Sequence, residues 1–189
     1  MSRSLPLALG AALIAGPALA SAPAGVTAAT GPAATIAPAR LPAQRAWGAA
    51  LVAIAAANRE GGPQRANAVA LDALNRLYGF ETGPVLFKPT LTRAPHTFRT
   101  TRESALAYFA GGDANFPGDT GFALGDWRSV AIENAAVRVV GDMALTTGNV
   151  RITDGQGRVT TVDKTWAFMR DAQGALRIVL HHSSLPFAG

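Results

Sequence analysis

The sequence predicts an α+β domain in which helices come first and an antiparallel sheet follows. Apolar residues recur at helical spacing in the first part of the folded region, and residues 127–185 then form four extended runs separated by short Gly- and Asp-rich turns. Helices followed by a strand meander are typical of the α+β class. Because long strands must curl to bury the helices, we expect a cone-like fold with a cavity between sheet and helices.

Two helices are expected at the start of the domain, near Gln44. Gly61-Gly62-Pro63 is expected to end the first helix, and Gly79 to close the second. The apolar positions are Trp47, Leu51, Ile54 and Ala55 in the first helix, and Val69, Leu71, Leu74 and Leu77 in the second.

A short extended segment and a third helix come next. Val85–Phe87 is expected to be extended and to stop at Pro89. Thr100, with Glu103 three residues later, resembles a capping box and predicts the start of the helix. Gly111-Gly112 is expected to end it.

A glycine-rich segment, residues 111–126, joins the helices to the sheet. It contains five glycines, three aspartates and one proline. A loop of this length in a compact domain is often a lid or a wall of a site. The alternative is a surface loop without a role.

The last of four expected strands is the most polar. The strands are Trp127–Val140, Met143–Thr153, Arg158–Arg170 and Ala175–Leu185. Strand alternation places His181 and Ser183 on one face, and His182 and Ser184 on the other together with Ile178. His181 and Ser183 can therefore share one small site. The alternative is a strand end whose polar groups only satisfy neighbouring backbone groups.

The charge pattern does not indicate a nucleic-acid partner. There are 17 Lys and Arg residues against 12 Asp and Glu, a formal net charge of +5, and the basic residues are spread along the chain. A nucleic-acid interface requires basic residues clustered on one face. This surface is at most mildly attractive to small anions.

The residue types available exclude several kinds of chemistry. The chain has no cysteine, so disulfides, thiolate metal ligands and a Cys nucleophile are excluded. Its three histidines are His96, His181 and His182. Because His181 and His182 are neighbours on one strand, they point to opposite faces, and a three-His zinc site is not expected. No G-x-S-x-G, G-x-G-x-x-G or P-loop motif supports a serine hydrolase or a nucleotide site.

The N-terminus predicts export. Leu7–Ala15 is a short apolar core that follows Arg3, and Ala18-Leu19-Ala20 fits a small-residue cleavage site. We expect a signal peptide at residues 1–20, a flexible Ala- and Pro-rich linker at residues 21–43, and one domain at residues 44–189. The alternative, a membrane anchor, is disfavoured because the apolar stretch is too short to span a bilayer. We therefore expect a periplasmic or secreted protein that has no stable membrane insertion.

Five aromatic residues are expected to be core rather than ligand contacts. Trp166 and Phe168 alternate on one strand face, which fits packing against the helices. The other three are Trp127, Phe87 and Phe109.

Several segments together resemble the iota-class carbonic anhydrases, which have the nuclear transport factor 2-like fold of the association domain of calmodulin-dependent kinase. The resemblance covers about residues 47–187. The segments are Gly83–Thr90, Tyr108–Gly112, Gly121–Leu124, Glu133-Asn134, Gly148-Asn149 and His181–Phe187. One departure is in residues 148–153, where Val150 and Arg151 stand at positions where we expect aromatics in this family.

The resemblance implies reversible hydration of CO2 to bicarbonate and a proton. It maps the family's polar pocket onto Thr90, Tyr108, His181 and Ser183 as catalytic residues, and it implies no metal cofactor, although zinc or manganese dependence stays open in the family. The resemblance also implies a homodimer or larger homo-oligomer. Two alternatives stay open: a non-catalytic ligand-binding or oligomerisation domain, and an isomerase-type site, which needs a buried acidic base.

Overall fold

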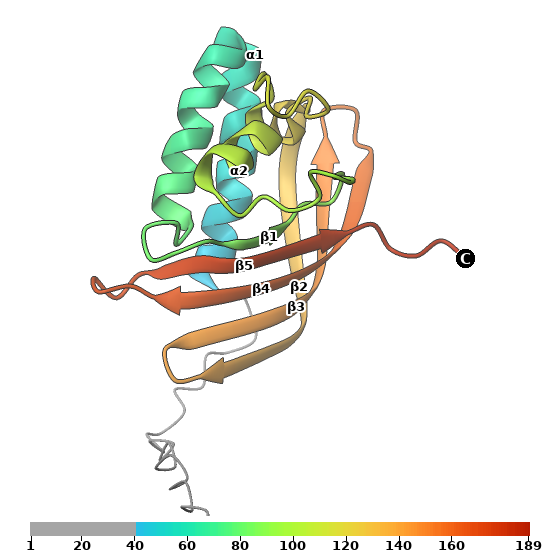
Figure 1. Ribbon diagram of the computed structural model, residues 1–189. Coiled ribbons are helices and arrows are strands. Elements are labelled where there is room, and N and C mark those ends of the chain that lie inside the picture. The colour runs from blue at the N-terminus through green and yellow to red at the C-terminus, as the bar shows by residue number, and fades with distance from the viewer. Residues whose placement is uncertain (1–40) are drawn as a thin grey trace, which may run out of the picture. The chain divides into compact units, whose positions relative to one another are not determined.

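The computed structural model describes residues 41–189, in which helices pack on a curled five-stranded sheet (Figure 1). The elements are α1 (Pro42–Leu77), β1 (Leu86–Lys88), α2 (Arg102–Ala110), a 3-10 turn (Phe122–Leu124), β2 (Trp127–Val140), β3 (Met143–Asp154), β4 (Val159–Arg170) and β5 (Leu176–Ser184). The predicted α+β class is confirmed. The predicted signal peptide and residues 21–40 of the predicted linker lie outside the described residues, and linker positions 42 and 43 belong to α1.

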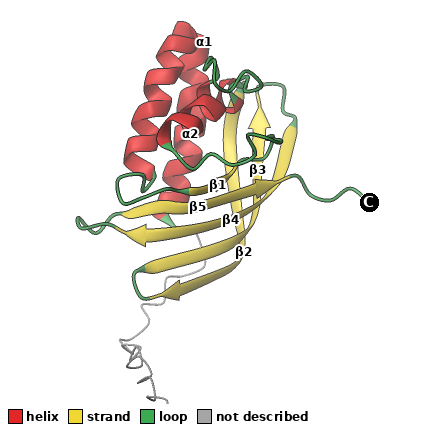
Figure 2. Cartoon of the chain, in the orientation of Figure 1, coloured by secondary structure: helices red, strands yellow, loops and turns green. Residues whose placement is uncertain are grey.

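The sheet has the strand order β1-β5-β4-β3-β2. Strands β2 to β5 form the predicted antiparallel meander. β1 adds a parallel edge next to β5, with Phe87 opposite His181, so the sheet is mixed. The helices lie together on one side of the sheet (Figure 2). The C-terminal strand that carries the polar motif therefore lies between β1 and β4.

The element α1 is two helices separated by a kink, as predicted. Gly62 has φ 75° and ψ −172°, which are not helical angles. Only glycine adopts such a backbone conformation without a steric cost. Pro63 then begins the second segment, where its fixed φ and missing N–H are tolerated. The kink lets both segments lie against the same sheet.

The predicted capping box of the third helix is off by one residue. Thr101 is the N-cap of α2: its hydroxyl accepts from the Ser104 N–H at 3.2 Å, and the Ser104 hydroxyl accepts from the Thr101 N–H at 3.2 Å. Thr100 is excluded from the cap because its carbonyl accepts from the Val85 N–H, which ties it to the preceding loop. Glu103 is left in the first turn, where its charge favours the positive end of the helix.

A bulge in β5 changes the predicted alternation. Leu180 is paired with Ala167 and Ile178 with Phe168, so Val179 has no partner across the ladder. An extra residue reverses which face the following side chains occupy. The expectation that Ile178 shares a face with His182 is therefore wrong. His181 and Ser183 are buried while His182 is exposed, so the predicted separation of His182 from the other two is confirmed.

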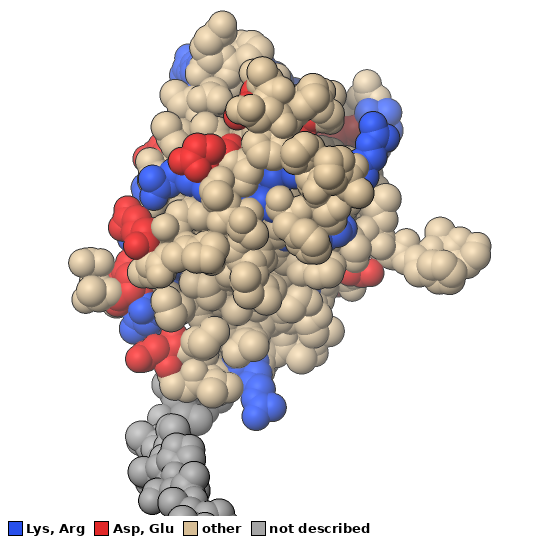
Figure 3. Space-filling view, viewed as in Figure 1, with Lys and Arg blue, Asp and Glu red and all other residues tan. Residues whose placement is uncertain are grey.

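Most of the predicted core aromatics are buried between sheet and helices. Phe87, Phe109, Trp166 and Phe168 are buried, and Trp127 is half-buried. Charged side chains of both signs lie in small separate groups on the face shown in Figure 3, which agrees with the absence of a basic run in the sequence. No helix within residues 41–189 is long and apolar enough to cross a membrane.

Candidate active site

All four predicted site residues line one small pocket between the sheet and the helices. Thr90 follows β1, Tyr108 belongs to α2, and both His181 and Ser183 come from β5. The lining side chains lie close together and leave no room for a water molecule, so a ligand would be admitted only as they move apart. Its other lining residues are Trp47, Phe87, Pro89, Phe109, Phe122 and Lys164. Phe87 and Phe109 are thus pocket walls as well as core residues, and Lys164 was not predicted.

Two hydroxyl groups form a close pair at this pocket. Thr90 Oγ1 lies 2.6 Å from Ser183 Oγ, and either atom can donate. β1 pairs in parallel with β5, with Lys88 opposite His182, and this pairing places Thr90 beside Ser183. Lys88 Nζ also donates to the Ser183 carbonyl at 3.0 Å. One hydroxyl of such a pair donates to the other and keeps further capacity for a ligand.

The Tyr108 hydroxyl is buried and makes no hydrogen bond of standard geometry within the described residues. Burial raises the pKa of Tyr108 to about 12, although the nearby Thr90 side chain and Leu91 backbone oppose that shift. The ring is stacked on Phe122 at a centroid distance of 5.5 Å. Tyr108 is therefore protonated at neutral pH, and its donor has no protein acceptor. A buried donor in this state is available to a ligand or to an ordered water.

Both ring nitrogens of His181 are occupied by protein groups. Nδ1 lies 2.9 Å from the Tyr78 hydroxyl, and Nε2 lies 2.7 Å from Lys164 Nζ. The ring is also stacked on Phe87 at 4.5 Å. Burial, together with the charges of Lys164 and His182, holds the pKa of His181 well below its usual value. His181 is neutral at neutral pH and fixed in orientation.

Tyr78 and Trp47 continue this hydrogen-bonded chain into the core. Trp47 Nε1 donates to the Tyr78 hydroxyl at 3.0 Å. Burial raises the pKa of Tyr78 well above its usual value, so it also stays protonated. An indole N–H only donates, so the Tyr78 oxygen always accepts from Trp47.

Lys164 is a buried lysine without a carboxylate partner. Its side chain is 4% exposed, and it makes no ion pair within residues 41–189. Nζ lies 4.3 Å from the centroid of the Trp47 ring and 5.5 Å from that of Trp166. Burial lowers the pKa of Lys164 to about 7. Lys164 is paired with Ser183 across the β4–β5 ladder, so it stands directly beside the hydroxyl pair.

A sequence signal for Lys164 existed. Strand alternation that turns Phe168 and Trp166 toward the helices also turns Lys164 toward them, two residues further back. A lysine at an inward position is rarely tolerated without a role or a partner.

The glycine-rich segment 111–126 forms a wall of the site. Asp119 accepts from the Arg99 guanidinium through both carboxylate oxygens, at 2.9 Å each, and both side chains are buried. Arg99 is itself tied to β1, because its backbone N–H donates to the Phe87 carbonyl at 2.9 Å. The ion pair thus anchors the segment that carries Phe122 into the pocket.

No metal-binding cluster is present in the described part of the chain. Residues 41–189 hold no group of three or more His, Asp or Glu side chains that is arranged to bind an ion. His96 and His182 are exposed, away from the buried His181. Val150 and Arg151, where the resemblance leads us to expect aromatics, do not line the pocket: Val150 is core and Arg151 pairs with Glu133.

The fold and the pocket define a class of small α+β domains with a polar pocket between helices and a curled sheet. Residues 41–185 match the family described as metal-independent carbonic anhydrase, so this chain belongs to that family. A metal-independent carbonic anhydrase from Nostoc sp. is 57% identical over 147 residues, which are 78% of this chain and 72% of the relative.

A solved structure supports the same assignment. A cyanobacterial iota-carbonic anhydrase in complex with bicarbonate is 56% identical, with a TM-score of 0.77 over 78% of this chain and 90% of that chain. A calcium/calmodulin-dependent kinase II association domain from Xanthomonas campestris is 22% identical, with a TM-score of 0.46 over 75% of this chain and 83% of that chain.

Proposed function

We propose that this protein is a carbonic anhydrase that hydrates CO2 reversibly to bicarbonate and a proton, without a metal cofactor. The observation that carries the proposal is the buried pocket in which the hydroxyls of Thr90, Tyr108 and Ser183 meet a lysine that has no carboxylate partner. Such a pocket suits a small anion with several oxygen atoms. A family named for metal-independent carbonic anhydrases, and a relative solved with bicarbonate, support it.

The proposed mechanism uses both parts of the pocket. CO2 is apolar overall and is held against the rings of Phe87, Phe109 and Phe122. Tyr108 and one hydroxyl of the Thr90–Ser183 pair donate to the oxygens that become negative as bicarbonate forms, and the other hydroxyl of the pair accepts from the attacking water. Bringing water and CO2 together and stabilising developing charge with fixed donors are the two sources of rate.

A second class of function, an isomerase-type site, has no support in this pocket. It requires a buried acidic base, and no Asp or Glu is among the residues that line the pocket. A non-catalytic bicarbonate-binding domain remains the competing proposal.

Stopped-flow measurement of CO2 hydration separates these proposals. We expect the purified protein to accelerate hydration, and we expect the same rate after treatment with a strong metal chelator. A protein that binds bicarbonate in calorimetry but adds nothing to the uncatalysed rate would support the binding domain instead. A rate that falls on chelation and returns with added zinc or manganese would contradict metal independence.

We also propose export to the periplasm or the medium, on the sequence pattern of residues 1–20. The mature chain is then expected to begin at Ser21. The position of cleavage is checked by intact-mass analysis of the periplasmic protein after expression in a bacterial host and fractionation. A periplasmic protein that retains Met1 would contradict the cleavage site.

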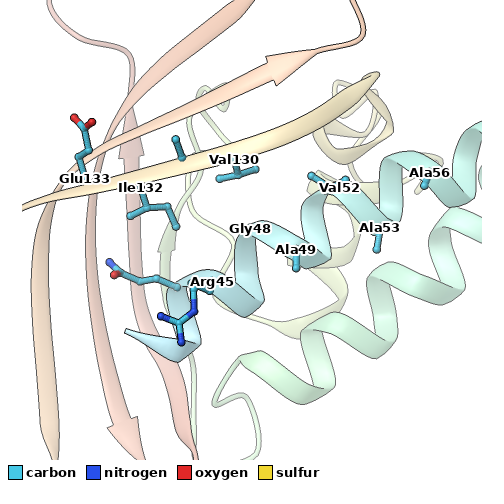
Figure 4. Close-up of a pocket in the computed structure, with 11 residues that line it drawn as sticks. Arg45, Gly48, Ala49, Val52, Ala53, Ala56, Val130, Ile132 and Glu133 are labelled. Atoms are coloured by element: carbon cyan, nitrogen blue, oxygen red, sulfur yellow. The ribbon is translucent and has the colours of Figure 1, made fainter. Parts of the chain in front are cut away.

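We further propose that the chain assembles as a homodimer or larger ring through an open groove between α1 and β2. The groove has a volume of about 720 Å³, and Val130 and Ile132 of β2 point toward α1 across it (Figure 4). Its lining is mainly small and apolar, and Ala49 and Ala53 are exposed there. Apolar surface left open in a monomer is commonly covered by a second copy.

Light scattering coupled to size exclusion tests this assembly. We expect a dimer or larger species for the wild type and a monomer for Ala53→Arg, because a buried guanidinium without a partner opposes association. Ala68→Arg, an exposed alanine of α1 outside the groove, is the matched control and should keep the wild-type mass. A monomeric wild type at micromolar concentration would contradict the proposal.

A further inference from the structure

We propose that Lys164 is the group that takes up the proton released when water attacks CO2, an inference that rests on the carbonic anhydrase function proposed above. Hydration of CO2 at neutral pH requires a base beside the attacking water. In most proteins with such a reaction a histidine is the first candidate. Here the arrangement of His181 and Lys164 points to the lysine.

His181 has no free nitrogen to offer a water molecule. Tyr78 occupies Nδ1 and Lys164 occupies Nε2, at 2.9 and 2.7 Å. A water would have to break one of these buried hydrogen bonds before the ring could accept its proton, and a buried group left without its partner is costly. His181 is therefore a positioning residue that holds Lys164 in place.

Lys164 Nζ retains capacity beyond its contact with His181. A neutral amine has two hydrogens and one lone pair. When one hydrogen is donated to His181 Nε2, the lone pair and the second hydrogen remain for the pocket that Lys164 lines together with Ser183. This arrangement requires the His181 tautomer that is protonated on Nδ1, where the ring donates to the Tyr78 oxygen. In the tautomer protonated on Nε2, Tyr78 donates to Nδ1 and the Nε2–H occupies the Lys164 lone pair instead.

The same hydrogen bonds persist after proton uptake. Lys164 as an ammonium still donates to His181 Nε2, so the imidazole does not change its tautomer. Two further ammonium hydrogens are then available to the product. The step thus requires little reorganisation of the buried chain, which favours a low barrier.

The proposed step is balanced in atoms and charge. The water oxygen forms a bond to the carbon of CO2, one O–H bond of water breaks, and its proton bonds to the Nζ lone pair. A π electron pair of CO2 moves onto oxygen, which gives bicarbonate beside the Lys164 ammonium. A second water or a buffer base then removes the proton from Nζ and restores the amine.

The groups around Lys164 leave it as the site that titrates near neutrality. The titratable groups that contact it or share its pocket are His181 from β5, Tyr108 from α2 and, through His181, Tyr78 at the end of α1. The pKa of His181 is held low and those of both tyrosines are raised, so all three stay neutral. The pKa of Lys164 is lowered to about 7 by burial. A base is most effective when its pKa lies near the working pH.

NMR titration of the lysines tests the acid–base state without relying on activity. The chain contains only two lysines, Lys88 and Lys164, so ¹³C-labelled lysine gives two Cε signals, and Lys88→Met assigns them. We expect the Lys164 signal to titrate near pH 7. A Lys164 signal that titrates near the ordinary lysine value of about 10.4 would overturn the proposal.

Two substitutions with different charges test the catalytic role. Lys164→Met fits the apolar surroundings and should lower kcat roughly 100-fold or more, as expected on loss of a general base. Lys164→Arg keeps a positive charge but does not release a proton near neutral pH, so it should be similarly impaired. Near-wild-type kcat in Lys164→Arg would show that only charge is needed and would overturn the proton-acceptor role.

A matched control and a fold check complete the experiment. Arg170→Met removes an exposed cation from the same strand and should leave kcat unchanged. Circular dichroism should show a native fold for each variant. A wild type without CO2 hydration would refute the proposed function itself, whereas an active wild type with an unimpaired Lys164→Met would refute only the role of Lys164.

Discussion

Tyr108→Phe is expected to lower CO2 hydration by roughly tenfold to a thousandfold without destabilising the fold. The Tyr108 hydroxyl is buried and has no hydrogen-bond partner of standard geometry within residues 41–189, so Tyr108→Phe breaks no such bond. Removing an unsatisfied buried polar group is neutral or stabilising. A loss of rate at constant or higher stability is the signature of a group held for the reaction. Stopped-flow kinetics and urea unfolding of the same samples measure both quantities.

The second tyrosine is the matched control for this experiment. Tyr78→Phe removes a hydroxyl that accepts from Trp47 and contacts His181, so it should cost about 1–3 kcal/mol of unfolding free energy. The pair therefore separates a hydroxyl that supports the fold from one that awaits a ligand. Full activity in Tyr108→Phe would remove Tyr108 from the mechanism.

Ser183 and Ser184, at the end of β5, extend the comparison. Ser183→Ala breaks the hydroxyl pair with Thr90 in the pocket and should lower the rate in the same range as Tyr108→Phe. Ser184 does not line the pocket, so Ser184→Ala should change the rate little. A larger loss of activity from Ser184→Ala than from Ser183→Ala would place the reaction on the other face of β5.

Local patterns predicted the elements that carry the site, because each depends on neighbours in sequence. The kink at Gly62, the four long strands and the separation of His181 and Ser183 from His182 follow from glycine chemistry or strand alternation. The role suggested for Thr90 and Tyr108 came from a resemblance, since nothing local links two residues on different elements. Their proximity to β5 depends on the long-range packing of α2 and β1.

The features that sequence reasoning missed are set by contacts across the fold. The capping residue shifted to Thr101 because a hydrogen bond from Val85 holds Thr100 in a loop. The bulge at Val179 is a property of the β4–β5 pairing, not of either strand alone. Lys164 was overlooked because a search for metals and triads attends to His, Cys, Asp and Glu. Alternation back from Trp166 would have located it.

Asp119→Ala is expected to destabilise the protein by about 3–5 kcal/mol, the usual cost of leaving one member of a buried ion pair without its partner. Arg99 and Asp119 have side chains 3% and 8% exposed, and Asp119 is bound through both of its oxygens. Arg99 also contacts the Phe116 ring and the His96 carbonyl, so it cannot easily move out to solvent. Urea unfolding measures the loss.

Asp126→Ala provides a control of the same residue type in the same segment. Asp126 is 45% exposed and pairs with Arg59 and Arg128 at the surface, where removal of an ion pair costs about 1 kcal/mol or less. The double variant Arg99→Met with Asp119→Ala should recover part of the stability lost in Asp119→Ala, because no buried charge is then left unpaired. Equal stability of Asp119→Ala and Asp126→Ala would contradict a buried anchor. If the anchor holds, Asp119→Ala should also lower CO2 hydration, since Phe122 and the ring of Tyr108 stacked on it depend on this wall of the pocket.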